Sequence, residues 1–142
     1  MKPSLIIPRI RLLVPEFANR VASTAEFAAA QSAIEDVAVP AAFVVPLAES
    51  VTDNQSVPKV TQYFDDQFGV IIVVDNSADN RGQAGAEQLS DLRDSLLTAL
   101  VGWRPTAIYM PITYQGSEHL AMDAARLWYQ TNFGAKRIIQ QA

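Results

Sequence analysis

Residues 68–76, FGVIIVVDN, form the stretch on which the fold of this chain depends. The run from Val70 to Val74 is continuously apolar and β-branched, a pattern typical of a strand buried on both faces. A helix is predicted over residues 84–101, because its leucines recur at helical spacing while charged side chains occupy the opposite face. We therefore expect a central strand covered by an amphipathic helix. The leucines that define it are Leu89, Leu92, Leu96, Leu97 and Leu100.

Shorter elements flank this centre. Helical spacing predicts a helix over residues 3–14, and Ser23 with Glu26 three residues later predicts a capping box at the start of a second helix. Runs of alternating or β-branched residues predict further strands, with tight turns at residues 65–67 and 115–117. These strands are VPAAFVVPLAES (39–50, near a sheet edge), PKVTQYF (58–64), TAIYMPITY (106–114), HLAM (119–122) and RLWYQTNF (126–133), followed by a final extension over residues 134–142.

The order of these elements predicts the fold class. Two helices, three strands, one helix and three further strands indicate an α+β protein with a mainly antiparallel or mixed sheet of about five to six strands and helices packed on one face. The sequence contains no repeat, low-complexity tract or linker. We therefore expect a single domain over residues 1–142.

Composition and charge narrow the classes of function. Acidic residues outnumber basic ones by 15 to 11, and no basic cluster exceeds Lys136–Arg137, so a dedicated nucleic-acid-binding surface is not expected. There is no cysteine and one histidine, His119, which leaves no disulfide, thiolate or multi-histidine metal site. No apolar run is long enough to cross a membrane, so we expect a soluble, cytoplasmic protein. Only 18% of residues are charged, which fits a compact monomer or apolar surface buried against copies or partners.

The loop within VVDNSADNRGQAG (73–85) is the strongest candidate for a chemical site. A calcium loop starting at Asp75 would need a glycine at its sixth position and a glutamate at its twelfth, and the sequence has neither. A phosphate loop would need a fuller glycine pattern or a lysine, and a nucleophilic Asp75 would need a second acid where Ser77 stands. Asn76, Asp79 and Asn80 can instead form a turn and cap the following helix. We expect no catalytic residue, metal or cofactor here.

Four segments together resemble the Mu-like group of phage tail terminator proteins. They are FVVPLAES, FGVIIVVDNSADNRGQAG, LSDLRDSLLTALVGWRP and RLWYQTNF, and their order and spacing extend the resemblance over about residues 3–138. The resemblance implies a virion structural protein rather than an enzyme. Such subunits form a ring, usually a hexamer, on the head-proximal end of the tail tube, stop its polymerisation and offer a docking surface to the head–neck complex.

The resemblance also implies the partners and the location of the protein. The partners are other copies of the chain, the tail tube protein and a neck or head-completion protein, while DNA passes through the lumen without sequence-specific binding and no membrane is involved. The location is the tail–neck junction of a virion assembled in the host cytoplasm. Alternatives are another head–tail joining protein, such as a neck, stopper or completion protein, a small enzyme that uses the 75–85 loop, and a monomeric binding domain.

Three segments are predicted to contact other subunits or partners. The loops 50–58 and 75–85 are polar and expected to be exposed, and the C-terminal stretch 136–142 is long enough to reach a partner. Aromatic residues on both faces of the strand 126–133 predict core on one face and interface on the other. The predicted contact residues are Asp53, Asn54, Asp75, Asn76, Asp79, Asn80, Arg81, Trp128, Lys136 and Arg137.

Overall fold

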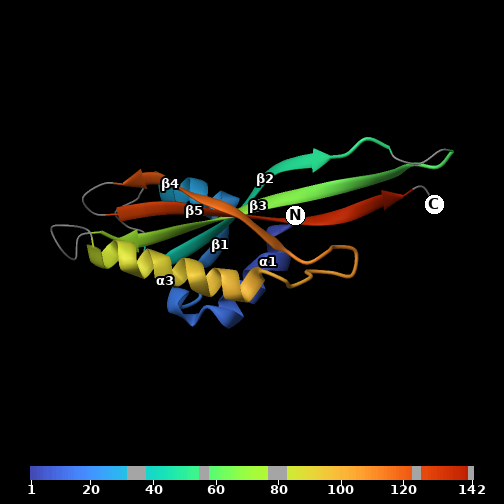
Figure 1. Ribbon diagram of the computed structural model, residues 1–142. Helices are drawn as coiled ribbons and strands as arrows, with labels where there is room; N and C mark the ends of the chain where they lie inside the picture. Colours follow the sequence, from blue (N-terminus) through green and yellow to red (C-terminus); the bar gives the residue numbers. More distant parts are fainter. Residues whose placement is uncertain (32–37, 55–57, 77–82, 123–125, 141–142) are drawn as a thin grey trace.

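The computed structural model describes residues 1–31, 38–54, 58–76, 83–122 and 126–140 (Figure 1). Within these residues, a five-stranded sheet packs with helices that come mainly from the first and third quarters of the chain. The helical elements are α1 (Pro3–Leu13), the short 3-10 helix η1 (Pro15–Phe17), α2 (Thr24–Gln31) and α3 (Gln83–Leu100). The strands are β1 (Val21–Ser23), β2 (Ala41–Val51), β3 (Thr61–Asp75), β4 (Thr113–Met122) and β5 (Arg126–Gln140).

The sheet is mixed but mainly antiparallel, which confirms the predicted α+β class. Its strand order is β1-β2-β3-β5-β4, and only the short pair β1–β2 is parallel. The central pair is β3 and β5, which run antiparallel along their whole length, from Thr61 opposite Gln140 to Asp75 opposite Arg126. The strand β1 is a three-residue element that the sequence patterns did not predict.

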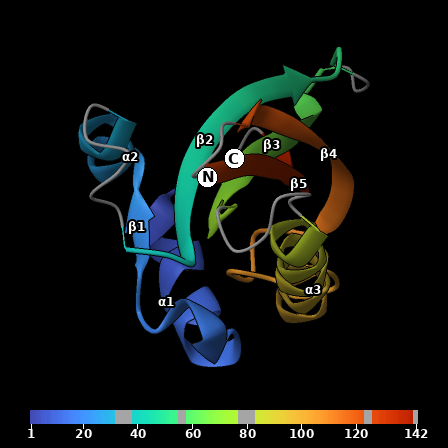
Figure 2. The same ribbon diagram turned by 90° about the vertical axis from the view of Figure 1, so that its left-hand side faces the viewer.

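The apolar run of β3 is buried on both faces, as predicted. Phe68, Val70, Ile72 and Val74 face a core formed with α1 and α3, which contact each other. Figure 2 shows α1 and α3 on the same side of the curved sheet. The alternate residues, including Ile71 and Val73, belong to a second cluster on the other face. Burial on both faces explains why this run is continuous rather than alternating.

The helix predictions are confirmed. The leucine face of α3 packs into the main core, and Ile6 and Ile10 of α1 are its fully buried partners. The capping box is also present: the backbone N–H and the hydroxyl of Ser23 both bond to the Glu26 carboxylate, the N–H at 2.9 Å. This bonding, first from the hydroxyl and then from the backbone, lowers the pKa of Glu26.

The two predicted tight turns are wrong. Residues 65–67 lie inside β3, because pairing with β2 and β5 on its two sides supplies backbone hydrogen bonds whatever the side chains are. Residues 115–117 lie inside β4, where the register shifts and Gly116 has a φ of 105°. A bulge inserts an extra residue without ending the strand, and glycine suits its backbone.

The predicted strand 106–114 is also wrong over most of its length. Its residues follow α3 as a loop in which only Tyr109 makes an isolated bridge, to Arg137, and β4 begins at Thr113. Pro111 has no N–H for a ladder, which accounts for the late start of the strand. The final extension, in contrast, is ordinary strand, because residues 134–140 continue β5.

A three-stranded arm extends beyond the helices (Figure 1). We define the arm by three segments. They are residues 47–54, which include the end of β2, residues 58–67, which include the start of β3, and residues 134–140, which form the end of β5. Among the described helices, none has the length and hydropathy needed to cross a bilayer.

Candidate assembly surface

The structure brings together two of the three predicted contact segments. The described parts of the 50–58 loop and of the C-terminal stretch belong to the arm, whereas the 75–85 loop begins at the opposite end of β3. Because β3 is 15 residues long, these two ends are roughly 45 Å apart. Asp53, Asn54, Lys136 and Arg137 are in the arm, Asp75 and Asn76 are at the far end, and Asp79, Asn80 and Arg81 lie outside the described residues.

Backbone and side-chain hydrogen bonds hold the end of the arm together. The Thr52 N–H donates to the Tyr63 carbonyl at 2.9 Å, and the Tyr63 N–H donates to the Thr52 hydroxyl at the same distance. The Asn54 side-chain carbonyl accepts the Thr61 N–H at 2.7 Å. Asn54 therefore links the segment that follows β2 to the start of β3.

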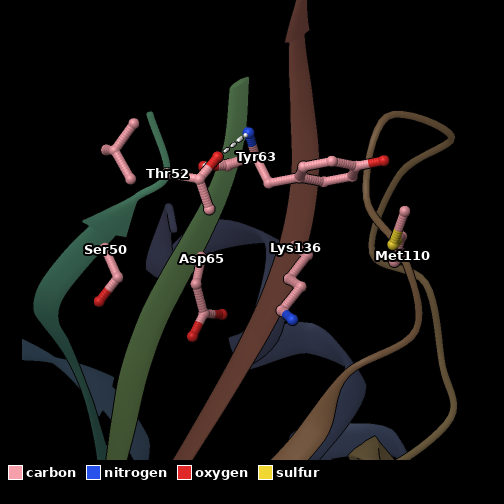
Figure 3. A pocket seen from close by; sticks show the side chains of 7 residues that line it. Ser50, Thr52, Tyr63, Asp65, Met110 and Lys136 are labelled. Carbon is pink, nitrogen blue, oxygen red and sulfur yellow. Dashed lines mark hydrogen bonds between the residues drawn. The ribbon is translucent and has the colours of Figure 1, made fainter. Parts of the chain in front are cut away.

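Apolar side chains are exposed along the arm. Tyr63 and Ile138, which are opposite each other on β3 and β5, are 40% and 42% exposed, and Val51 is 53% exposed. A hollow of about 540 Å³ lies on the same part of the sheet (Figure 3). Exposed apolar side chains gathered in this way make the arm a candidate interaction surface. The side chains that line the hollow are Ser50, Val51, Thr52, Tyr63, Asp65, Met110 and Lys136.

The opposite end of β3 is a close junction with α3. The Asp75 carboxylate lies 3.7 Å from the Arg126 guanidinium across the β3–β5 pair. Gly85, near the start of α3, approaches so closely that a Cβ there would lie 2.8 Å from the Asp75 carbonyl oxygen and 3.2 Å from the side-chain oxygen of Asn76. Asp75 and Asn76 are half-buried, and they take part in this structural junction.

Trp128 differs from the other predicted contact residues. Its side chain is only 3% exposed and belongs to the second core cluster with Phe43 and Val73. In the single chain Trp128 therefore packs the interior. Leu127 and Phe133 face the main core while Trp128 faces the other side, as the alternation predicts, but that side is a second core at Trp128 rather than the predicted interface.

Amide side chains form a strip on the sheet face away from α1 and α3. The Gln67 and Gln115 amides each lie 3.3 Å from the Asp65 carboxylate, and Gln130 donates to Asn132 at 2.7 Å. These residues come from three adjacent strands, β3, β5 and β4. We call them the amide strip; Asp65 is the one member with a charge.

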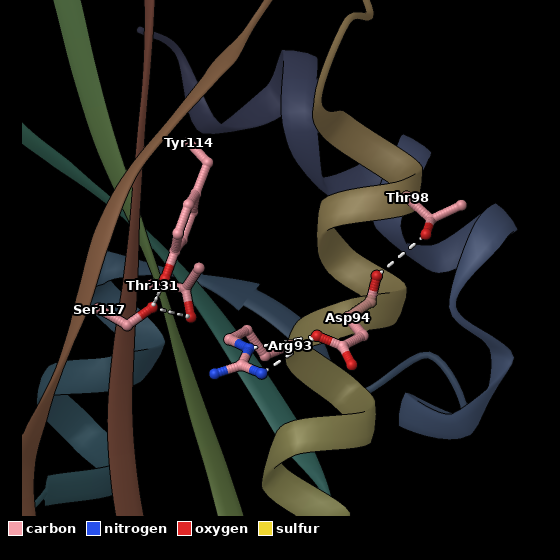
Figure 4. Close-up of polar contacts among 6 residues, drawn as sticks. All are labelled: Arg93, Asp94, Thr98, Tyr114, Ser117 and Thr131. Atoms are coloured by element: carbon pink, nitrogen blue, oxygen red, sulfur yellow. Dashed lines mark hydrogen bonds and ion pairs between the residues drawn. The ribbon is translucent and has the colours of Figure 1, made fainter.

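A polar contact fixes the bulge in β4 on the α3 side of the sheet (Figure 4). The Tyr114 and Ser117 hydroxyls are 2.6 Å apart, and the Ser117 hydroxyl donates to the buried Thr131 hydroxyl at 3.4 Å. Within the described residues no strand pairs with the outer edge of β4, and β1 covers β2 only at residues 42–44. The sheet thus has two edges able to pair with another chain.

The exposed face of α3 is acidic. Asp91 and Asp94 point away from the core, and the Arg93 guanidinium lies 3.2 Å from the Asp94 carboxylate (Figure 4). Hydrogen bonding to Tyr129, followed by Asp94, raises the pKa of Arg93 above its usual value. The helix therefore presents exposed carboxylates at its surface.

A buried polar cluster beneath the arm was not predicted. Asp66 is 3% exposed, pairs with the Met1 amine and accepts a hydrogen bond of 2.8 Å from the Tyr109 hydroxyl. Burial, and then the bond and charge of Asp66, raise the pKa of Tyr109 to about 12. The sequence pattern from which this cluster could have been predicted is the alternation of Phe64, Asp66 and Phe68. In an uninterrupted strand, this alternation places Asp66 on the buried face.

No arrangement of the described residues suits a metal ion, because no three histidine, aspartate or glutamate side chains there are close enough to hold one. The positions 79–81 of the loop that suggested calcium or phosphate lie outside those residues. What the described surface does offer is an apolar arm, two strand edges and an amide-lined face.

Such features are typical of a subunit that is built into a larger protein assembly. The family model for the phage tail terminator protein matches residues 1–142. The chain therefore belongs to the phage tail terminator family. This membership assigns it a structural role in a phage tail and a location in the virion.

A solved structure gives a related fold. A chain of the structure described as "Virion of native gene transfer agent (GTA) particle" superposes with a TM-score of 0.50 at 15% sequence identity, and the match covers 96% of this chain and 94% of that chain. At this identity the likeness shows the fold alone. Among curated proteins, none matches the sequence.

Proposed function

We propose that this protein forms a ring, a hexamer, that caps the head-proximal end of the phage tail tube. The ring stops polymerisation of the tube and then provides the docking surface for the head–neck complex. Membership of the tail terminator family supports this role. The observation that carries it is the exposed apolar arm, which lies at the opposite end of β3 from the 75–85 loop. One end can contact the tube while the other faces the neck.

Ring closure would use the two sheet edges. The outer edge of β2 after residue 44 and the edge of β4 lie on opposite sides of the sheet, so one copy can offer β4 to the β2 of the next. Contacts of this head-to-tail kind close into a ring when the rotation between copies is right. The bulges in β4 limit how long such a pairing can be, which disfavours open-ended stacking of sheets.

The amide strip suits the lumen of this ring. DNA is a polyanion, and a lining rich in lysine or arginine would hold it through its phosphates. Neutral amides with a single carboxylate, Asp65, do not bind phosphates in this way. We infer that DNA passes this surface without sequence-specific binding. No catalysis or cofactor is needed for such a role.

The remaining predicted contacts divide between the two ends. Asp53, Asn54 and Lys136 are in the arm and would face the tail tube protein. Asp75 and Asn76, with the adjoining residues 79–81, would face a neighbouring copy or the neck or head-completion protein. The protein would be assembled in the host cytoplasm and remain at the tail–neck junction of the virion.

Deletion of the gene tests the proposed function. Loss of a terminator leaves tube polymerisation uncontrolled, so we expect electron micrographs to show overlong tails without heads. Normal-length tails would contradict the proposal and favour the alternative of another head–tail joining protein. A virus producing normal tails and normal virions would exclude both.

A pair of variants tests the arm. Tyr63→Ser and Ile138→Ser remove facing apolar side chains from the arm, and we expect loss of binding to purified tail tubes in a sedimentation assay. Leu12→Ser is the matched control, because Leu12 is an exposed apolar residue on α1, away from the arm. Equal binding by all three variants would show that the arm is not the tube contact.

A further inference from the structure

A second cavity, of about 430 Å³, lies between the start of α1, the loop after α3 and the strands β3 and β5. It opens on the face of the arm opposite to the hollow of Figure 3, because Arg137 and Lys136 point to opposite sides of β5. Its lining combines positive charge, from Arg137 and Lys2, with apolar surface, from Ile108 and the Tyr109 ring. Nothing in the proposed function uses this cavity.

The Arg137 guanidinium is held in place by two aromatic rings. Its central carbon lies 4.9 Å from the centre of the Phe64 ring and 5.6 Å from that of Tyr109. Stacking of this kind fixes the plane of the guanidinium and leaves its edge free to donate hydrogen bonds. Arg137 takes part in no ion pair among the described residues.

Two polar atoms at the cavity have no hydrogen-bond partner. They are Nε of Arg137 and the hydroxyl oxygen of Thr106, and both are buried. A buried donor without a partner is unfavourable, and more so when it is charged. Asp66, the carboxylate that lines this cavity, is already bonded to Tyr109 and to the Met1 amine. These donors therefore suit an acceptor that comes from another molecule.

The chemistry of the cavity selects a carboxylate as that acceptor. An arginine edge donates two parallel hydrogen bonds to a carboxylate, and Nε is one of the two donors in that geometry. Asp66, which lines the same cavity, repels a phosphate dianion more strongly than a carboxylate that carries a single negative charge. The exposed Ile108 side chain at the rim can pack against the methylene groups of an acidic side chain.

We propose that this cavity binds the carboxylate of an acidic side chain on the next copy of the chain in the ring. The chain has a net charge of −4 and exposed carboxylates such as Asp91 on α3, so a copy of itself carries the complementary group. The inference rests on the proposed ring for the identity of this partner. The carboxylate chemistry of the cavity stands on the contacts of Arg137 and Thr106 alone.

The carboxylate chemistry is tested by NMR on the isolated protein. The Arg137 Nε–Hε resonance is followed during titration with N-acetylglutamate amide, with its glutamine analogue and with inorganic phosphate. We expect a saturable shift with the glutamate compound, half-complete at a concentration on the order of 1–10 mM as befits a single ion pair. The glutamine analogue should give none and phosphate a weaker response. No saturable shift, or an equal one with phosphate, would overturn the proposal.

Assembly on purified tail tubes tests the partner. Arg137→Met keeps an apolar stem over the two rings but removes the donors, and Arg11→Met makes the same charge change near the end of α1, outside the arm and this cavity. We expect the Arg137 variant to need at least tenfold more protein for ring formation, from the loss of about 1.5–3 kcal/mol for a charged hydrogen bond, and the Arg11 variant to assemble like the wild type. Melting curves establish that both variants are folded.

The outcomes separate the two proposals. If the wild type forms rings and Arg137→Met does so equally well, the contact between copies is wrong while the proposed function stands. If the wild type forms no ring although the NMR shift is present, the ring is wrong, and with it the assignment of the partner to a second copy. Thr106→Val should weaken binding of the glutamate compound several-fold in the NMR titration. An unchanged titration would show that Thr106 is not part of the site.

Discussion

Replacing Asp66 with asparagine should destabilise the protein far more than the same change at the neighbouring Asp65. Asp66 is 3% exposed and pairs with the Met1 amine and the Tyr109 hydroxyl. Asparagine has the same size and keeps an acceptor for Tyr109, so the change removes charge without opening a cavity. In the variant, the Met1 ammonium group remains without its counter-ion.

The expected magnitude follows from these contacts. Breaking a buried ion pair by removing one partner costs about 3–5 kcal/mol. Water reaches the half-buried surroundings of this pair, so we expect a loss in the free energy of unfolding near the lower of these figures. A loss of about 3 kcal/mol in a chain of this length lowers the melting temperature by roughly 10 °C. Asp65 is less buried and only accepts hydrogen bonds of 3.3 Å from two amides, so Asp65→Asn should cost less than about 1 kcal/mol.

Urea unfolding and thermal melting, each followed by circular dichroism, measure both variants against the wild type. The change should appear in the denaturation midpoint with an unchanged slope, because the extent of surface exposed on unfolding stays the same. Equal losses at Asp65 and Asp66, or a loss below about 1 kcal/mol at Asp66, would refute the claim that this buried cluster stabilises the fold.

Three further predictions test other contacts. The pKa of Tyr109 is raised to about 12 from an unfolded value near 10, so the folded state holds this proton to a higher pH than the unfolded state does. About 2–3 kcal/mol of stability present below pH 10 should therefore be lost as the pH rises to 12. Tyr109→Phe should remove that part of the pH dependence of stability measured by urea titration. Gly85→Ala places a Cβ 2.8 Å from the Asp75 carbonyl and should cost about 1–3 kcal/mol in the same assay, and a neutral effect would show that this junction can relax. Because the Ser23 hydroxyl and then its backbone N–H lower the pKa of Glu26, NMR titration of Ser23→Ala should show that pKa returning toward its usual value, and an unchanged pKa would contradict the capping contact.

The helices and the central strand could be predicted because each carries its own pattern. The leucine spacing of α3 and the β-branched run of β3 reflect burial that local periodicity records directly. The capping box is equally local, since Ser23 and Glu26 are three residues apart. For these elements the tertiary structure agrees with the local preference.

The errors occur where pairing with distant strands overrides local preference. Asp65 and Asp66 have turn-forming side chains, but β5, some 70 residues further along, holds them in a strand. Gln115 to Ser117 likewise stay within β4 because β5 pairs on both sides of the bulge. Local turn chemistry contains no information about such a partner.

The candidate assembly surface shows the same division. The polar loop and C-terminal residues, such as Asn54 and Lys136, are recognisable from sequence, but that they share one arm depends on the register of β2, β3 and β5. The burial of Trp128 and the partners of Asp66 depend on that register as well. Arg137 could be recognised as a charged terminal residue, whereas its place between two rings at a cavity could not.

By itself the sequence determined the α+β class, the buried strand and the amphipathic helix, and the family resemblance, because hydrophobic periodicity and the order of motifs are written along the chain. Only the tertiary structure decided that the polar residues 65–66 lie within a strand, that two of the predicted contact loops adjoin opposite ends of one long strand, β3, and that Arg137 and Thr106 meet at one cavity. The physical reason is that these features arise from contacts between residues distant in sequence, whose geometry is set when the long strands β3 and β5 pair.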